Sequence, residues 1–180
     1  VNIDIKLDIE EGTFNVTSGT VNVNDNSLDA CLLVTSTAML DIDAGTVNIG
    51  ASGNSNSEID MSNGTIDISG GTLNINDELD IADGTFTQTG GTVNIKSYVG
   101  SGNGTGTSKF DMDAGTLNLT AGTLRINGQT TTSASSNPAM RIASGVTVNS
   151  NSGHTILIQT NNTTSNDEDI YLDLNGKDIG

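Results

Sequence analysis

The five-residue segment Gly-Thr-apolar-polar-apolar recurs along the whole chain, and this repetition constrains the fold more than any other feature. Residues 63–76, "NGTIDISGGTLNIN", contain it twice in succession. Longer copies, which open on an apolar-polar-apolar tripeptide, begin at Leu7, Leu40, Ile59, Leu79, Phe110, Met140 and Leu172. The starts are between 19 and 33 residues apart, and a bounded period of this kind indicates a repeat architecture.

Apolar and polar residues alternate strictly inside the copies, as in "LDIADGTFTQTGGTVNI" from Leu79. An alternation with a period of two predicts β-strands with one buried face. Each predicted strand has three to five residues, and glycine, which turns the chain without steric cost, separates the strands. Because hairpins of such short strands are unstable alone, we expect the chain to wind, so that each strand pairs with its counterpart in the next copy.

The predicted fold class is therefore all-β, a parallel β-helix (β-solenoid) with three short strands per coil, about six to seven coils and insertions along one edge. Residues 1–180 are expected to form a single β-solenoid segment, an excerpt of a longer repeat protein. The insertions are predicted at 24–39, 96–109, 127–139 and 159–171. Loops gathered on one edge are common recognition surfaces, although tolerated surface insertions explain them as well.

The alternation also predicts three interior columns of stacked apolar pairs. The first contains Leu7/Ile9, Leu40/Ile42, Ile59/Met61, Leu79/Ile81 and Phe110/Met112. The second contains Phe14/Val16, Val47/Ile49, Ile66/Ile68 and Leu117/Leu119. The third contains Val21/Val23, Leu73/Ile75, Val93/Ile95 and Leu124/Ile126.

Two departures from this pattern stand out. Gln88 occupies an inward position, and the second copy has no apolar third strand in "GASGNSNSE". We expect the apolar run "CLLV" before that copy to cover the gap. The lone Cys31 lies in this run, has no Cys or His companions at metal-binding spacing, and is interpreted as a small buried hydrophobe.

The charge balance excludes some classes of partner. The chain has 22 acidic and 6 basic residues, a net charge of −16. Nucleic acids and anionic membrane surfaces require clustered Lys and Arg, so neither is an expected partner. No apolar run approaches the length of a membrane helix, so we expect no membrane insertion by this segment.

Aspartate fills the outward position of the first strand in almost every copy, although strands disfavour it. Stacked carboxylates repel by about 1 kcal/mol in water and by several times that near a protein surface. Bound calcium would relieve this repulsion, since Ca²⁺ prefers hard oxygen ligands. The candidate ligands are Asp41, Asp43, Asp60, Asp80, Asp83, Asp111 and Asp113. No EF-hand loop or "GGxGxD" signature is present, and a solvated acidic column without metal is the alternative.

Threonine and asparagine fill the outward positions of the other two strands. We predict Thr13/Asn15, Thr46/Asn48 and Thr116/Asn118 on one sheet, and Thr20/Asn22, Thr72/Asn74 and Thr92/Asn94 on another. Hydrogen bonds between stacked side chains explain this pattern structurally. Regular threonine arrays on a flat solenoid face also resemble ice-binding proteins. The usual pattern in those proteins is Thr-x-Thr, whereas asparagine mostly fills the second position here. An ice-binding face is therefore a minor alternative.

The sequence points to no catalytic residue. The single His154 has no Ser/Asp constellation around it and is interpreted as a surface histidine. Glycoside hydrolysis uses a pair of carboxylates, but with so many aspartates such a pair could be assembled almost anywhere, so their presence does not indicate this activity. Aromatic and basic residues, which carbohydrate-acting β-helices use, are scarce. We therefore predict that the chain is not an enzyme and has no cofactor besides the candidate calcium.

Segments such as "AGTLNLTAGTLRI" and "SGGTLNINDELDIADGTFTQTGGTVNI" resemble the repeat regions of large exported bacterial surface proteins. Autotransporter passengers and the adhesin-like proteins that Bacteroidetes export by the type IX system are the nearest comparisons. The resemblance covers nearly the whole chain and implies a right-handed β-helix and an extracellular, cell-surface location. It transfers no active-site residues, because the shared motif is a structural repeat.

The expected function is therefore that of a non-enzymatic stalk or adhesin segment. Its expected partners are flanking repeats or domains of the same polypeptide, together with a surface glycan or protein ligand. The main alternative is a carbohydrate-binding or carbohydrate-cleaving β-helix, similar to a lyase or a phage tailspike.

Overall fold

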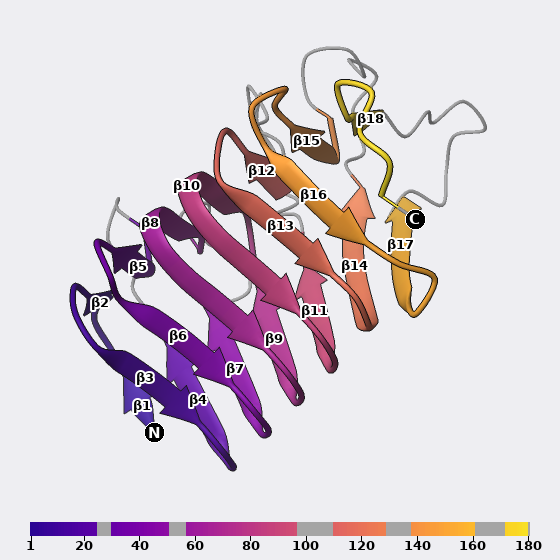
Figure 1. Ribbon diagram of the computed structural model, residues 1–180. Helices are drawn as coiled ribbons and strands as arrows, with labels where there is room; N and C mark the ends of the chain where they lie inside the picture. The colour runs from indigo at the N-terminus through magenta and orange to yellow at the C-terminus, as the bar shows by residue number, and fades with distance from the viewer. Residues whose placement is uncertain (25–29, 51–56, 97–109, 129–137, 161–171, 180) are drawn as a thin grey trace.

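The computed structural model of the 180-residue chain describes residues 1–24, 30–50, 57–96, 110–128, 138–160 and 172–179. Within these ranges the regular structure is β throughout, without a helix. Strands pair in parallel and in register with strands one repeat earlier and one repeat later (Figure 1). This arrangement is consistent with the predicted β-solenoid. A side here means a row of strands that pair from one repeat to the next, and a coil means one passage of the chain through three successive sides.

The third sides of successive coils together form a seven-stranded sheet in the described part of the chain. Its strands, in spatial order, are β1 (Asn2–Ile3), β4 (Thr20–Val23), β7 (Thr46–Ile49), β9 (Thr72–Ile75), β11 (Thr92–Ile95), β14 (Gly122–Gly128) and β17 (His154–Thr160). Spatial order equals sequence order, so each strand from β4 to β14 lies between its counterparts in the two neighbouring coils.

The first and second sides together form an eleven-stranded sheet among the described residues. The first side holds β2 (Leu7–Ile9), β5 (Leu32–Thr35), β12 (Phe110–Met112), β15 (Met140–Ile142) and β18 (Leu172–Asp173). The second side holds β3 (Thr13–Val16), β6 (Met39–Ile42), β13 (Thr116–Leu119) and β16 (Thr147–Ser150).

Two long strands, β8 (Ile59–Ile68) and β10 (Leu79–Gln88), run through both of these sides. Their pairing shifts register between Ile81 and Asp83 and again between Asp83 and Thr85. These two irregularities mark the corner between the first side and the second side, where the strands bend in Figure 1.

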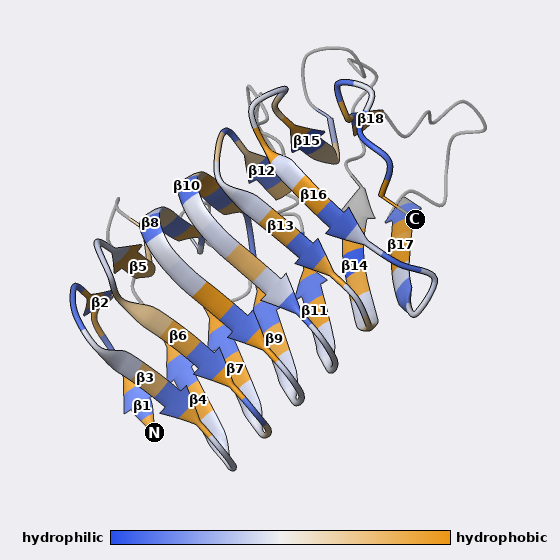
Figure 2. Ribbon diagram, viewed as in Figure 1, coloured by the Kyte–Doolittle hydropathy of each residue, from blue (hydrophilic) through white to orange (hydrophobic). Residues whose placement is uncertain are grey.

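Inward side chains fill the space between the three sides. Figure 2 shows the alternation of hydrophobic and hydrophilic residues along the strands. Predicted column neighbours such as Met61 and Ile81 are paired and buried, and Phe86 packs edge-to-face on Phe110 with ring centroids 5.7 Å apart. Burying a large apolar side chain contributes roughly 1.5–3 kcal/mol, so this core is the main source of stability.

The second coil differs from the prediction. Leu40 and Ile42 do not lie in the first column: they belong to β6 on the second side, where Ile42 pairs with Ile68. Val47 and Ile49 belong to the third column instead of the second. The first side of this coil is β5, built from the apolar run "CLLV", so the run completes the coil and no third strand is missing.

The predicted insertions need a matching correction. The segment 24–39 contains β5, and it is therefore not a single insertion. The remaining predicted insertions, 96–109, 127–139 and 159–171, lie mostly outside the described residues. In chain order each of them connects a strand of the third side to the next strand of the first side.

Glycine occupies the corner between the second and third sides in successive coils, at Gly19, Gly45, Gly71, Gly91 and Gly122. All five have positive φ, which glycine adopts without a Cβ penalty. A Cβ on Gly71 would also lie 2.7 Å from the carbonyl oxygen of Gly45 in the preceding coil. Backbones of adjacent coils therefore approach here more closely than any larger residue permits.

The replacement Gly71→Ala should lower the free energy of unfolding by about 2–4 kcal/mol, because it combines an unfavourable φ with a backbone clash. Gly19→Ala is the matched control, since Gly19 has a similar φ, but a Cβ at this position would meet no atom of another part of the chain within 4 Å. It should cost only about 1–2 kcal/mol. Urea unfolding measures both, and equal losses would contradict the close-approach argument.

Candidate functional site

The acidic column on the first side exists, but it is shorter than the sequence predicts. Asp60, Asp80 and Asp111 are direct register partners on β8, β10 and β12. Leu33 separates Asp60 from Asp8 at the N-terminal end, and Arg141 follows Asp111 on β15. The column therefore consists of three stacked aspartates that end at an arginine.

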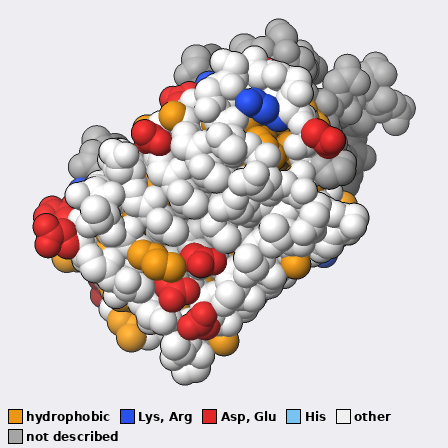
Figure 3. All heavy atoms as spheres, in the orientation of Figure 1, with side chains coloured by type: hydrophobic (Ala, Val, Ile, Leu, Met, Phe, Trp, Pro, Cys, Tyr) orange, Lys and Arg blue, Asp and Glu red, His pale blue; other side chains and the backbone are white. Residues whose placement is uncertain are grey.

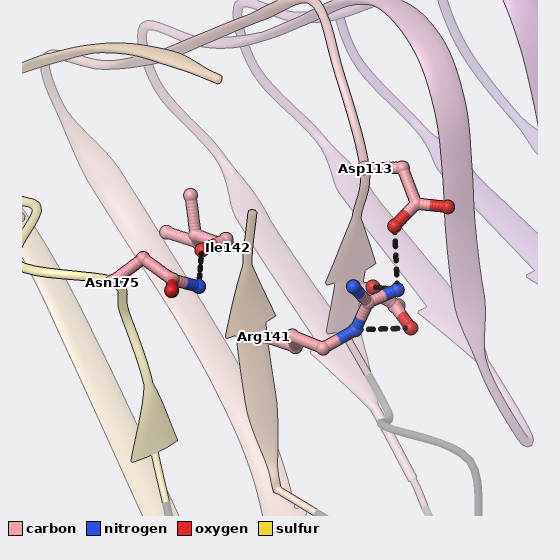
Figure 4. Close-up of polar contacts among 5 residues, drawn as sticks. Asp113, Arg141, Ile142 and Asn175 are labelled. Carbon is pink, nitrogen blue, oxygen red and sulfur yellow. Dashed lines mark hydrogen bonds and ion pairs between the residues drawn. The ribbon is translucent and has the colours of Figure 1, made fainter. Parts of the chain in front are cut away.

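Arg141 neutralises the C-terminal end of this column (Figure 4). Its Nε donates to Asp111 Oδ2 at 2.9 Å, and its Nη2 lies 2.5 Å from Asp111 Oδ1 and 2.7 Å from Asp113 Oδ1. Asn175, from the segment after β18, donates to the carbonyl of Ile142 at 2.8 Å and attaches that segment to β15. The cation thus ties three acidic oxygens together across a coil boundary.

The other end of the column retains its mutual repulsion. Burial raises the pKa of Asp60 and Asp80, and the charge of Asp60 adds to the effect on Asp80. Glu58, directly before β8, has a pKa raised to about 7 by burial and by the charges of Asp60, Asp77 and Asp80. Lys6 opposes this effect at Asp60. Sequence analysis missed Glu58, because it lies outside the repeated tripeptide.

Asp41 and Asp43 lie elsewhere, on the second side and at the corner after it. Asp41 pairs in register with Asp67 on β8, and burial followed by the charge of Asp43 raises the pKa of both. The hydroxyl of Ser69 donates to Asp43 Oδ1 at 2.9 Å. Assigning Asp41 to the first-side column was therefore wrong, for the same reason that Leu40 was misplaced.

The predicted calcium ligands thus fall into separate groups. Asp83 accepts a hydrogen bond from the backbone N–H of Gly84 at 2.7 Å, a local interaction at the corner of β10. Figure 3 shows acidic side chains in small, separated clusters on the visible face. Within the described ranges, no group of three or more His, Cys, Asp or Glu side chains is placed to hold a metal ion. Calcium binding stays a prediction from the sequence.

Gln88 points inward as predicted, and it connects three coils. Its Nε2 lies 3.1 Å from the carbonyl oxygen of Thr123 and 3.3 Å from that of Gly90. Its Oε1 lies 3.0 Å from Nε2 of His154, at the start of β17. His154 is therefore half-buried and bonded, not a surface histidine, and burial lowers its pKa.

The outer surface of the third side carries a continuous asparagine ladder. The Nδ2 group of each ladder residue donates to Oδ1 of its counterpart one coil earlier, at 2.7–2.8 Å. Its members are Asn2, Asn22, Asn48, Asn74 and Asn94. The structure places Asn48 in this ladder, whereas the repeat pattern of the sequence predicts it on the same sheet as Asn15. Four consecutive coils therefore carry the same Thr-x-Asn pattern on one surface.

Comparisons with known proteins add no identification. No family model matches the chain, and neither a curated protein nor a solved structure matches it. None of the described segments forms a helix with the length and hydropathy that crossing a membrane requires. The functional argument therefore depends on the geometry of the chain itself.

We expect Asn74→Ala to lower the free energy of unfolding by about 1–3 kcal/mol, because the half-buried Asn74 both donates and accepts within the ladder. Asn149→Ala is the control: Asn149 is exposed and makes one bond of this kind, to Asn118. Its loss should cost less than about 1 kcal/mol. Chemical denaturation of both variants compares them, and similar losses would contradict a structural role of the ladder.

The raised pKa of Glu58 predicts a pH-dependent stability. Between pH 4.5 and about 7 the folded chain holds more protons than the unfolded chain, so the free energy of unfolding should increase as the pH falls through this range. Glu58→Gln should raise stability at about pH 8 by about 1 kcal/mol, after allowance for solvent screening, and flatten the profile.

Denaturant unfolding at about pH 8 and about pH 5 measures this linkage. The exposed Glu10 supplies the matched control, and Glu10→Gln should leave the profile nearly unchanged. A native chain that is more stable at the higher pH would contradict the assignment.

Proposed function

We propose that this chain is a non-enzymatic spacer segment of a large exported bacterial surface protein, a rigid stalk of the adhesin type. In this proposal the winding is right-handed, with about six to seven coils. Flanking repeats or domains of the same polypeptide are the partners at its two ends. A surface glycan or protein is the ligand of the segments that connect the third side to the first.

The observation that carries the proposal is the unbroken series of parallel, in-register pairings along the chain. Each coil bonds to the next through its backbone on the sides that are described, and the asparagine ladder adds a side-chain connection on the third side. Coil-to-coil bonds of this density resist bending. A chain built this way converts sequence length into axial length at about 4.8 Å per coil.

The acidic surface fits an exported spacer. A net charge of −16 favours solubility and keeps copies of the chain apart. The cost is repulsion within the fold, as at Asp60 and Asp80, where Lys6 and Arg141 neutralise the column only in part. Tolerating this repulsion is reasonable for a chain whose stability comes from repeated pairing and a continuous core.

A carbohydrate-acting β-helix is the second candidate. The perturbed carboxyl pKa of Glu58, next to stacked aspartates, is the kind of feature that catalytic acids show. Against it, the described aromatic residues Phe86 and Phe110 are fully buried and Phe14 packs against the core, so the described residues offer no aromatic platform for a sugar ring. Turnover on a polysaccharide panel, abolished by Glu58→Gln, would replace the spacer proposal with this one.

The spacer proposal predicts a fixed separation between distant coils. Spin labels at Thr20→Cys and Thr123→Cys, in a Cys31→Ala background, lie four strand positions apart on the third side. At about 4.8 Å per step, the backbone separation should be about 19 Å. Pulsed electron paramagnetic resonance should give a narrow distance distribution that salt does not change.

The same labelled chain in urea is the control, and its distribution should be broad. A broad or salt-dependent distribution in the folded chain would contradict a rigid spacer. A separation far from the expected value would contradict the stacking of the coils themselves.

A further inference from the structure

The third side carries a two-dimensional array of identical polar side chains. Its outward threonines are direct register partners from coil to coil: Thr20, Thr46, Thr72, Thr92, Thr123 and Thr155. The asparagine ladder runs parallel to this row, two residues farther along each strand. The spacing is about 4.8 Å between coils and about 6.6 Å along a strand.

This surface differs in charge from the rest of the molecule. None of the described strands of the third side contains Asp or Glu, although the whole chain has 22 acidic residues. The described strands of this side contain one Lys or Arg, Arg125 on β14, and Lys96 follows directly after β11. The strands β4, β7 and β9 therefore present an uncharged surface.

The hydrogen-bonding groups of this surface fall into two kinds. The asparagine amides bond to each other, which fixes their positions. The hydroxyls of Thr46, Thr72 and Thr92 form no hydrogen bond with another residue in the described ranges. A row of regularly spaced hydroxyls, held by a rigid backbone, is thus left for hydrogen bonds with solvent.

We infer that the third side binds the ordered water lattice of ice. A matching ligand has to be flat, uncharged, periodic in two dimensions and able to donate and accept hydrogen bonds at every repeat. Crystalline polysaccharides share the periodicity, but proteins that bind sugars commonly stack aromatic rings on them, and the described strands β4, β7, β9 and β11 contain no Phe, Tyr or Trp. Ice meets all four requirements, and the fixed side chains need little reorganisation to bind it.

The register correction in the second coil supports this inference. With Thr46 and Asn48 on β7, four consecutive coils, from β4 to β11, repeat one outward pattern without interruption. The second side also repeats an outward threonine from β8 to β16. Its described strands do not repeat one outward pair over four consecutive coils, because Met39 and Asp41 on β6 and Asp67 on β8 interrupt the pattern. The inference does not depend on the spacer proposal, since a rigid spacer with an inert third side remains a spacer.

The test compares two variants that differ only in the surface they disturb. Thr72→Tyr places a bulky ring at the centre of the third side, and Thr65→Tyr places the same ring at the equivalent half-buried, post-glycine position of the second side. We expect the native chain to show thermal hysteresis and to form faceted ice crystals. Thr72→Tyr should lose this activity, and Thr65→Tyr should retain it.

Circular dichroism establishes that both variants keep their strand content. If Thr72→Tyr does not fold, Thr46→Tyr on the neighbouring β7 takes its place with the same expected loss. The inference is overturned if the native chain shows neither hysteresis nor crystal shaping, or if folded variants of both surfaces lose activity equally. Binding to microcrystalline cellulose in the absence of ice activity would also overturn it.

Discussion

The architecture depends on how closely the backbones of successive coils approach at the corners. Parallel pairing at strand spacing is needed on all three sides at once, so each corner has to stack on the corner below it. At Gly71 and Gly122 a Cβ would meet a backbone carbonyl of the preceding coil. Glycine at these positions therefore permits the register that the core columns, the asparagine ladder and the acidic column all share.

Much of the fold follows from the sequence alone. Alternation and corner glycines predicted parallel stacking of short strands, and the predicted core pairs lie in their predicted columns except for Leu40/Ile42 and Val47/Ile49. The error in the second coil has a physical cause: all three sides bury similar apolar pairs, so a tripeptide such as Leu40-Asp41-Ile42 does not reveal which side it occupies. The pairing of Leu32 and Val34 with the neighbouring first-side strands settles the register, although their outward neighbour is Leu33 and not aspartate.

The candidate site was less predictable, because its members interact across coils. The column of Asp60, Asp80 and Asp111 follows from the repeat, whereas Glu58 lies directly before β8, outside the repeated motif. The contact between Gln88 and His154 joins residues 66 positions apart, and only the coil geometry brings them together. Repetition predicts what recurs in every coil, while these exceptions concentrate where one coil departs from its neighbours.

The asparagine ladder also has a direction. Every Nδ2 group donates toward the N-terminal coil, so the amide dipoles align along the long axis and each bond polarises the next. An extension of the ladder would need different chemistry at its two ends. A residue placed before Asn2 would have to accept a hydrogen bond, and a residue placed after Asn94 would have to donate one. Arg125, a side chain with donors alone, occupies the position after Asn94. The two ends of the asparagine ladder are therefore chemically different: its N-terminal end offers a donor, and its C-terminal end offers an acceptor.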